Sequence, residues 1–159
     1  CYVGQTPTLG CDLTLDPVSG DYKEQDLTGR RLNNAPEWAA TAGASYGTEL
    51  ASGAELDLSV DLVYSGRYTT NLFQGPYDFQ NAFAKLNASA KFTSADKSWD
   101  IMLIGRNLTN KYTVATTSAL TFTGSGSGNP NARFADTYGV VSRGREIFLQ
   151  VTLRPGFLN

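Results

Sequence analysis

The stretch Ala54-Glu55-Leu56-Asp57-Leu58-Ser59-Val60-Asp61-Leu62-Val63-Tyr64-Ser65 decides the fold, because its apolar residues recur at every second position. Its three carboxylates fall on one side of a β-strand, whereas a helix would spread them around its circumference. The alternation lasts twelve residues, and an ordinary strand has about five or six. The stretch therefore predicts a long strand with one apolar face and one charged face.

Four further stretches repeat this alternation, at residues 37–46, 82–92, 99–107 and 146–154, and together they predict an all-β antiparallel chain. Across the five stretches, the apolar faces hold 26 residues without a charge, whereas the opposite faces hold 25 residues with ten charges. Such an uncharged face is typical of the inner side of a β-sandwich or of the lipid-facing side of a membrane barrel.

The composition of the uncharged face distinguishes these two folds. Eight of its 26 residues are alanine, which is too small to fill the space between two packed sheets at the density of a protein interior. Fluid lipid chains fill such gaps themselves. The stretches are also nine to twelve residues long, which is the length that a strand tilted by about 45° needs to cross a bilayer. The pattern therefore indicates transmembrane strands whose charged side lines a wide, wet lumen.

Charged and aromatic residues are distributed as such a barrel requires. The charged residues that we expect to face the lumen are Glu55, Asp57, Asp61, Lys85, Lys91, Asp100 and Arg106. Aromatic residues stand at the ends of the uncharged faces, where membrane barrels carry interfacial girdles. The expected lipid-facing girdle consists of Trp38, Tyr46, Tyr64, Phe92, Trp99 and, by extension of the last face, Phe157.

The connections between strands alternate in length. Those at 47–53 and 93–98 are short, whereas those at 66–81 and 109–145 are long. Bacterial outer-membrane barrels have short periplasmic turns and long extracellular loops, so the lengths predict which end of the sheet is outside.

The N-terminal residues 1–35 then form another extracellular loop, and residues 36–159 supply transmembrane strands with their loops. Cys1 and Cys11 are the only cysteines, and they fit a loop-closing disulfide in an oxidising compartment. A lipidated N-terminal cysteine and a pair of free thiols are the alternatives.

Four runs resemble the C-terminal part of a TonB-dependent outer-membrane receptor. They are Gln25–Leu32, Asn34–Trp38, Gly105–Tyr112 and Gly144–Leu153. In that family, a run like Asn107-Leu108-Thr109-Asn110-Lys111-Tyr112 closes the penultimate strand. The resemblance implies a barrel of about 22 strands with an N-terminal plug and a TonB-interacting segment, which imports a scarce nutrient of the siderophore, vitamin or glycan class.

Five strands do not close a barrel, because about eight is the smallest number that does. Two open edges in lipid would leave backbone polar groups unpaired, and each unpaired group would cost several kcal/mol. We therefore expect the chain to be a fragment of a longer polypeptide in the bacterial outer membrane. Its expected partners are membrane lipid, the remaining strands and plug, and the TonB energy-coupling complex.

Aromatic and cationic residues in the long connections are candidates for ligand binding, because aromatic rings stack on ligands and arginine pairs with anions. The candidates are Arg67, Tyr68, Phe73, Tyr77, Phe122 and Phe134, with Phe79, Arg133 and Tyr138 as further members. Packing of the loops against one another explains the aromatic residues equally well. The glycine-rich run 124–128 lacks the Lys-Ser/Thr of a phosphate-binding loop and indicates an external loop.

The composition argues against several classes of function. The chain has no histidine, a net charge of −2 and an isoelectric point near 5.0, so imidazole catalysis, His-ligated zinc and nucleic-acid binding are not expected. It also has no run of about 18 apolar residues that would cross a membrane as a helix.

The acidic side chains of Glu55, Asp57 and Asp61 could line a cation path, although hydration in the lumen explains them equally well. We expect no enzymatic activity, no cofactor and no metal site. The alternative function is that of a secreted β-sandwich adhesin or lectin-like module.

Overall fold

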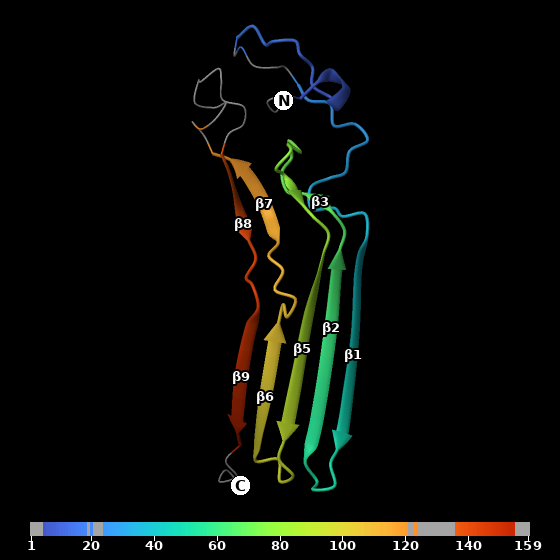
Figure 1. Ribbon diagram of the computed structural model, residues 1–159, viewed down its shortest axis with the longest axis vertical. Helices are drawn as coiled ribbons and strands as arrows, with labels where there is room; N and C mark the ends of the chain where they lie inside the picture. Colours follow the sequence, from blue (N-terminus) through green and yellow to red (C-terminus); the bar gives the residue numbers. More distant parts are fainter. Residues whose placement is uncertain (1–4, 19, 21–23, 121–122, 124–135, 155–159) are drawn as a thin grey trace. The chain divides into compact units, whose positions relative to one another are not determined.

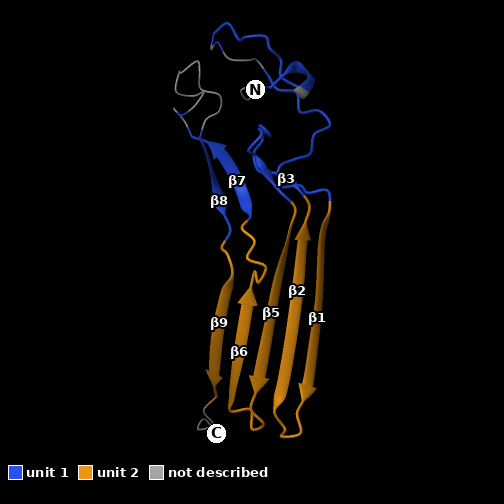
Figure 2. Cartoon of the chain, in the orientation of Figure 1, with its two compact units in different colours: residues 1–37, 67–81, 113–142 blue, residues 38–66, 82–112, 143–159 orange. Residues whose placement is uncertain are grey.

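The computed structural model describes residues 5–18, 20, 24–120, 123 and 136–154, which form an all-β chain with antiparallel sheets. The part of the chain so described contains one short helical element, the 3-10 turn η1 (Pro7–Leu9). The chain divides into two compact units (Figure 2). Unit 1 comprises Cys1–Glu37, Arg67–Asn81 and Thr113–Ser142, and unit 2 comprises Trp38–Gly66, Ala82–Tyr112 and Arg143–Asn159.

Unit 2 contains one antiparallel sheet with the strand order β1-β2-β5-β6-β9 (Figure 1). The strands are β1 (Ala39–Glu49), β2 (Glu55–Ser65), β5 (Phe83–Thr93), β6 (Trp99–Arg106) and β9 (Glu146–Leu153). Each strand falls on one of the five stretches that alternate in the sequence. The prediction of an all-β antiparallel fold is therefore confirmed.

The pairing register joins the predicted faces of all five strands. One row across the sheet consists of Tyr46, Leu58, Ala90, Leu103 and Leu149. The next row consists of Gly47, Asp57, Lys91, Met102 and Gln150. Directly opposed residues point to the same side of a sheet, so the sheet has one continuous uncharged face and one continuous charged face.

The first strand is longer at its C-terminal end than the sequence pattern predicts. The pattern places a turn at 47–53, whereas β1 continues to Glu49. Gly47 pairs with Asp57, and a Cβ atom on Gly47 would lie 2.9 Å from the Asp57 carboxylate. The actual turn ends at Gly53, whose φ of +81° favours glycine. Gly47 is therefore a strand residue that makes room for a neighbouring side chain.

Asn107 terminates β6 and hydrogen-bonds to segments on both sides of it. Its side-chain Nδ2 donates to the carbonyls of Lys111 and Arg143 at 2.9 and 3.1 Å, and its Oδ1 accepts from the Lys111 backbone N–H at 2.9 Å. Its backbone N–H donates to Oδ1 of Asn87 in β5 at 2.9 Å. Asn107 is buried, and its φ of +48° is one that asparagine tolerates.

The residues after Asn107 add further bonds to the same strands. The Leu108 backbone N–H donates to the Leu86 carbonyl at 2.7 Å, and the Thr109 hydroxyl donates to the Ala84 carbonyl at 2.9 Å. Asn110 Oδ1 accepts from the backbone N–H just before β9, at Arg145, at 3.0 Å. The Asn-Leu-Thr-Asn run therefore connects β6 to β5 and to the start of β9.

Unit 1 contains two hairpins within connections that the sequence pattern predicts as loops. The first pairs β3 (Tyr68–Thr69) with β4 (Phe79–Gln80), and the second pairs β7 (Val114–Ala119) with β8 (Thr137–Val141). An isolated bridge joins Cys11 to Gln25. The N-terminal segment, expected as a separate loop over 1–35, thus belongs to the same unit as the two long connections.

Hydroxyl groups and one carboxylate form the interior of unit 1. Thr70, whose exposed fraction is 1%, has its Oγ1 2.8 Å from Oγ1 of Thr117, which donates to Asp78 Oδ1 at 2.6 Å. The Thr117 backbone N–H also donates to the Thr70 carbonyl at 3.1 Å. This polar cluster joins the β3–β4 hairpin region to β7.

Cys11 is buried and disulfide-bonded. Its expected partner, Cys1, lies outside the described residues.

Replacing Asn107 with glycine should destabilise the chain by about 2–3 kcal/mol, since several hydrogen bonds worth about 1 kcal/mol each are lost while the left-handed backbone stays accessible. Urea unfolding followed by tryptophan fluorescence in detergent micelles measures the loss. Asn81→Gly, at an exposed residue, is the matched control. Equal stability of the two variants would show that Asn107 does not hold the strands together.

Candidate functional site

No second protein layer covers the uncharged face of the sheet in the described part of the chain. Leu103 is 50% exposed and Leu149 is 68% exposed, Leu58 is also exposed, and Leu86 is half-buried. Among the described residues, the buried hydrophobic ones are Cys11 and Ala54. The sheet is therefore a single layer whose apolar side chains have no protein core to enter.

Aromatic residues of the expected girdle lie toward the two ends of this face. Trp38 precedes β1 and lies opposite Gly66, beside the row of Tyr64, while Phe92 and Trp99 pack together at the other end with ring centroids 5.6 Å apart. The rows of Trp38 and Trp99 are about twelve residues apart along the strands, or roughly 40 Å, which a tilt near 45° reduces to roughly 28 Å. This separation is close to the height of a membrane barrel's apolar band.

Two further girdle residues complete the expected set. Tyr46 is exposed and lies closer to the Trp99 end than to the Trp38 end. Phe157 lies outside the described residues.

The charged face carries all seven residues expected to line a lumen. The pairing register places Glu55, Asp57, Asp61, Lys85, Lys91, Asp100 and Arg106 on this side. Asp57 lies directly opposite Lys91, and the hydroxyls of Ser59 and Ser89 are 2.7 Å apart. The Arg106 guanidinium lies 5.6 Å from the Phe148 ring centroid. The face thus mixes both signs of charge and provides no concentrated acidic path.

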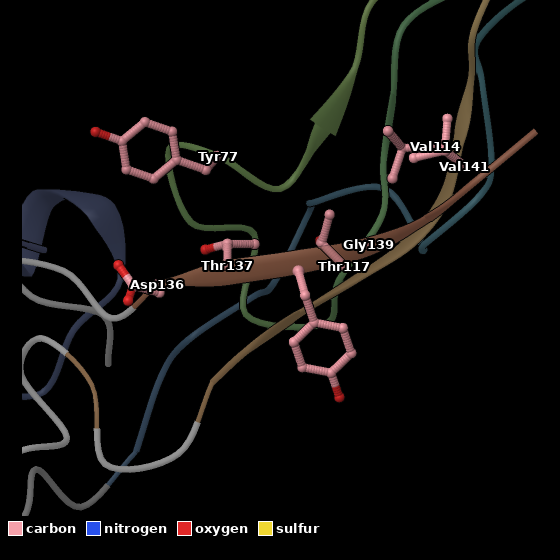
Figure 3. Close-up of a pocket in the computed structure, with 8 residues that line it drawn as sticks. Tyr77, Val114, Thr117, Asp136, Thr137, Gly139 and Val141 are labelled. Atoms are coloured by element: carbon pink, nitrogen blue, oxygen red, sulfur yellow. The ribbon is translucent and has the colours of Figure 1, made fainter.

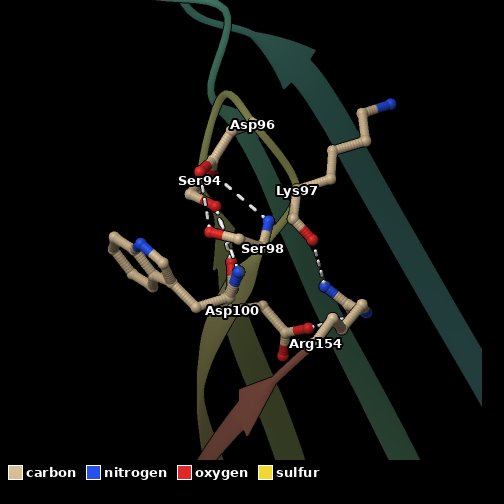
Figure 4. A network of polar contacts seen from close by, with 7 residues as sticks. Ser94, Asp96, Lys97, Ser98, Asp100 and Arg154 are labelled. Atoms are coloured by element: carbon tan, nitrogen blue, oxygen red, sulfur yellow. Dashed lines mark hydrogen bonds and ion pairs between the residues drawn. The ribbon is translucent and has the colours of Figure 1, made fainter. Parts of the chain in front are cut away.

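A half-buried ion pair lies at the end of the sheet near the β5–β6 turn (Figure 4). The Asp100 carboxylate, with 4% of its side chain exposed, pairs with the guanidinium of Arg154 just after β9. Arg154 also donates from Nη1 to the Lys97 carbonyl at 3.1 Å. One arginine therefore joins the end of the last strand to the turn before it.

Two charged residues of the same turn are held in their ionised forms. Hydrogen bonds from the hydroxyls of Ser94 and Ser98 lower the pKa of Asp96 from its ordinary value of 3.8. A hydrogen bond to Glu55, whose carboxylate lies 3.0 Å from the ammonium group, raises the pKa of Lys97 above 10.5. The turn is therefore a charged, hydrated end of the sheet.

Two of the candidate ligand-binding residues in unit 1 make contacts within the fold. The Arg67 guanidinium lies 4.1 Å from the centroid of the Phe79 ring. The Tyr68 hydroxyl donates to the Val114 carbonyl at 3.1 Å, and burial raises the pKa of Tyr68 above 10.0. Phe73 is exposed. Phe122, Phe134 and Arg133 lie outside the described residues.

Tyr77 and Tyr138 line an open pocket of about 670 Å³ in unit 1 (Figure 3). The other lining residues are Val114, Thr117, Asp136, Thr137, Gly139 and Val141. The sequence pattern identified both tyrosines but none of these six, because short strands rich in threonine and glycine give no clear alternation. The pocket is the part of unit 1 in which candidate residues meet.

The described residues contain no cluster of three or more His, Cys, Asp or Glu side chains that could hold a metal ion. Within the same residues, no helix has the length and apolar character to cross a membrane. The chain matches no protein-family model, no curated protein and no solved structure.

Replacing Arg154 with alanine should destabilise the chain by about 3 kcal/mol, because the buried Asp100 carboxylate loses its counter-charge. Arg145→Ala, which removes an exposed guanidinium from the opposite end of β9, should change the free energy of unfolding by less than about 0.5 kcal/mol. Urea titration of both variants in detergent provides the comparison. An unchanged free energy of unfolding in Arg154→Ala would contradict a structural role for the ion pair.

Proposed function

We propose that this chain forms the C-terminal strands of a TonB-dependent receptor in the bacterial outer membrane, which imports a scarce nutrient of the siderophore, vitamin or glycan class. The observation that carries the proposal is the continuous uncharged face across β1, β2, β5, β6 and β9, which no second layer of unit 2 covers. In this proposal the face contacts acyl chains and the opposite face lines the lumen.

The aromatic residues support a membrane position for the sheet. Their rows at the two ends of the uncharged face are separated by about the thickness of the hydrocarbon layer, if the strands tilt as in known barrels. Indole and phenol rings favour those interfaces because one end of each side chain is apolar and the other is polar. Alanine-rich rows between them suit fluid lipid better than a packed protein layer.

The open edges of the sheet support a longer polypeptide. Among the described residues, β1 and β9 each pair with one strand of the sheet. In lipid, the outward N–H and C=O groups of both strands require partners. Further strands of the same receptor would supply these partners, and its plug would occupy the lumen and connect to the TonB energy-coupling complex. The proposed role is transport and involves no bond chemistry.

The alternative function, a secreted β-sandwich adhesin or lectin-like module, requires a second sheet against Leu58, Leu86 and Leu103. Unit 2 supplies no such sheet, because its five strands form a single sheet. The importer is therefore the better supported of the two.

The membrane position is tested by comparing Leu58→Arg with Ser59→Arg, at the adjacent residue on the opposite face, in the complete polypeptide that carries this chain. Arginine in the lipid layer should destabilise the barrel by about 2–4 kcal/mol, whereas arginine at Ser59 enters the charged face between Asp57 and Asp61. Yield in the outer-membrane fraction and the free energy of unfolding are the measurements. Equal tolerance of both substitutions would contradict the proposal.

Import itself is tested by growth of cells that depend on the complete polypeptide for a ferric siderophore, cobalamin or an oligosaccharide. Growth on one of these nutrients should require TonB, while binding of that nutrient at the cell surface should not. Uptake that continues without TonB would contradict energy-coupled import but would leave the membrane position standing.

A further inference from the structure

The pocket in unit 1 has the size of a small-molecule site and is open to solvent. Its volume of about 670 Å³ falls within the range of roughly 300–1,000 Å³ that such sites occupy. Tyr77, Asp136 and Thr137 lie at one end, and Val114 and Val141 lie at the other, with Gly139 and Thr117 between them (Figure 3). The pocket therefore has an aromatic, polar end and a small aliphatic end.

The β7–β8 hairpin forms one side of the pocket, which is called its floor below. Thr117 lies opposite Gly139 in the register, and its hydroxyl is already bonded to Asp78 and Thr70. At Gly139 a side chain would crowd the hairpin itself, since a Cβ atom there would lie 3.0 Å from both the Thr116 carbonyl oxygen and Val114 Cγ1. The floor thus needs little rearrangement when a ligand enters.

The loop that carries Tyr77 is held by the same cluster. Asp78, its neighbour in sequence, is buried and accepts a hydrogen bond from the Gly75 backbone N–H at 2.9 Å as well as the one from Thr117. The Thr70 backbone N–H donates to the Asp78 carbonyl at 2.9 Å. The position of the Tyr77 backbone is therefore coupled to the floor of the pocket.

The charge of the pocket selects against anionic ligands. Of its described lining residues, Asp136 carries a formal charge, and none is lysine or arginine. With no lysine or arginine among the described lining residues, this carboxylate repels phosphates, carboxylates and other anions. It accepts hydrogen bonds strongly from hydroxyl groups, and the Thr137 hydroxyl both donates and accepts. The lining therefore fits a neutral ligand with several hydroxyl groups.

The aromatic side chain of Tyr77 favours a ligand that has an apolar ring face. Tyr77 is 64% exposed, so a large part of its side chain is open to a ligand. Strand alternation places Tyr138 on the side of β8 opposite Thr137 and Gly139, so the two tyrosines do not form a cage of the kind that binds quaternary ammonium groups. A sugar ring combines an apolar C–H face with hydroxyl groups around its edge.

We propose that this pocket binds a neutral oligosaccharide, with one sugar ring against Tyr77 and its hydroxyl groups bonded to Asp136 and Thr137. The pocket lies wholly within unit 1. The inference rests on the proposed transport function and deepens it, because it selects the glycan class from the nutrients named there. It names the ligand class that the loops capture.

The test compares Tyr77→Ala with Leu72→Ala in the complete polypeptide. Both side chains are exposed to a similar degree, 64% and 69%, but Leu72 does not line the pocket. The probes are neutral gluco-, xylo-, galacto- and manno-oligosaccharides, with oligogalacturonates of the same length as anionic counterparts, and binding is measured by calorimetry. Tyr77→Ala should weaken binding of the neutral probe roughly tenfold, and Leu72→Ala should leave it unchanged.

Asp136→Asn provides the second variant, because it keeps the shape of the side chain and removes its charge. Asp136→Asn should also weaken binding of the neutral probe roughly tenfold, and it should reduce the preference for neutral over anionic oligomers. Preferential binding of the oligogalacturonates, no binding of any neutral probe, or equal effects of the Tyr77 and Leu72 substitutions would overturn the proposal. None of these results bears on the arginine substitutions at Leu58 and Ser59, so failure of the ligand assignment is distinguishable from failure of the membrane assignment.

Discussion

The structure depends on covering one uncharged sheet face. Five strands spaced by about 4.8 Å, with some ten rows of about 3.3 Å each, present an area on the order of 800 Å². At about 25 cal/mol per Å², exposing it to water would cost roughly 20 kcal/mol, which is more than the whole stability of a typical domain. Such a face needs a cover of lipid or protein, and the described residues provide no protein for it.

Polar interactions hold the chain together where an apolar core is missing. The backbone ladder orders the sheet, Asn107 joins three strands at one end, and the ion pair of Asp100 with Arg154 joins the last two at the other. Unit 1 is likewise built on hydroxyl and carboxylate hydrogen bonds, centred on Thr70. In a protein surrounded by lipid, hydrogen bonds rather than hydrophobic burial must define the ends of the strands. The loops then gain enough rigidity from polar contacts to form a pocket.

The sequence predicts the five long strands because a period of two, sustained over nine to twelve residues and with charge confined to one side, has no helical equivalent. It misplaces the end of β1, where Gly47 looks like a turn residue but serves as a strand residue beside Asp57. It misses the short strands β3, β4, β7 and β8, whose two to six residues carry too few apolar positions for a periodic signal. Of the pocket, it identifies Tyr77 and Tyr138 by residue type, whereas Asp136, Thr137 and Gly139 are brought to it by hairpin pairing that local sequence does not encode.

The most direct test of the membrane-facing surface is fluorescence quenching by spin-labelled lipids. Single cysteines at Leu103 and Met102, adjacent residues on opposite faces of β6, would carry an environment-sensitive fluorophore in the complete polypeptide reconstituted in phospholipid vesicles. The label at position 103 should emit at short wavelength and be quenched by lipids with the spin label deep in the acyl chain, while the label at position 102 should respond to a water-soluble quencher. Equal quenching at both positions, or protection of position 103 from lipid and water alike, would contradict the account.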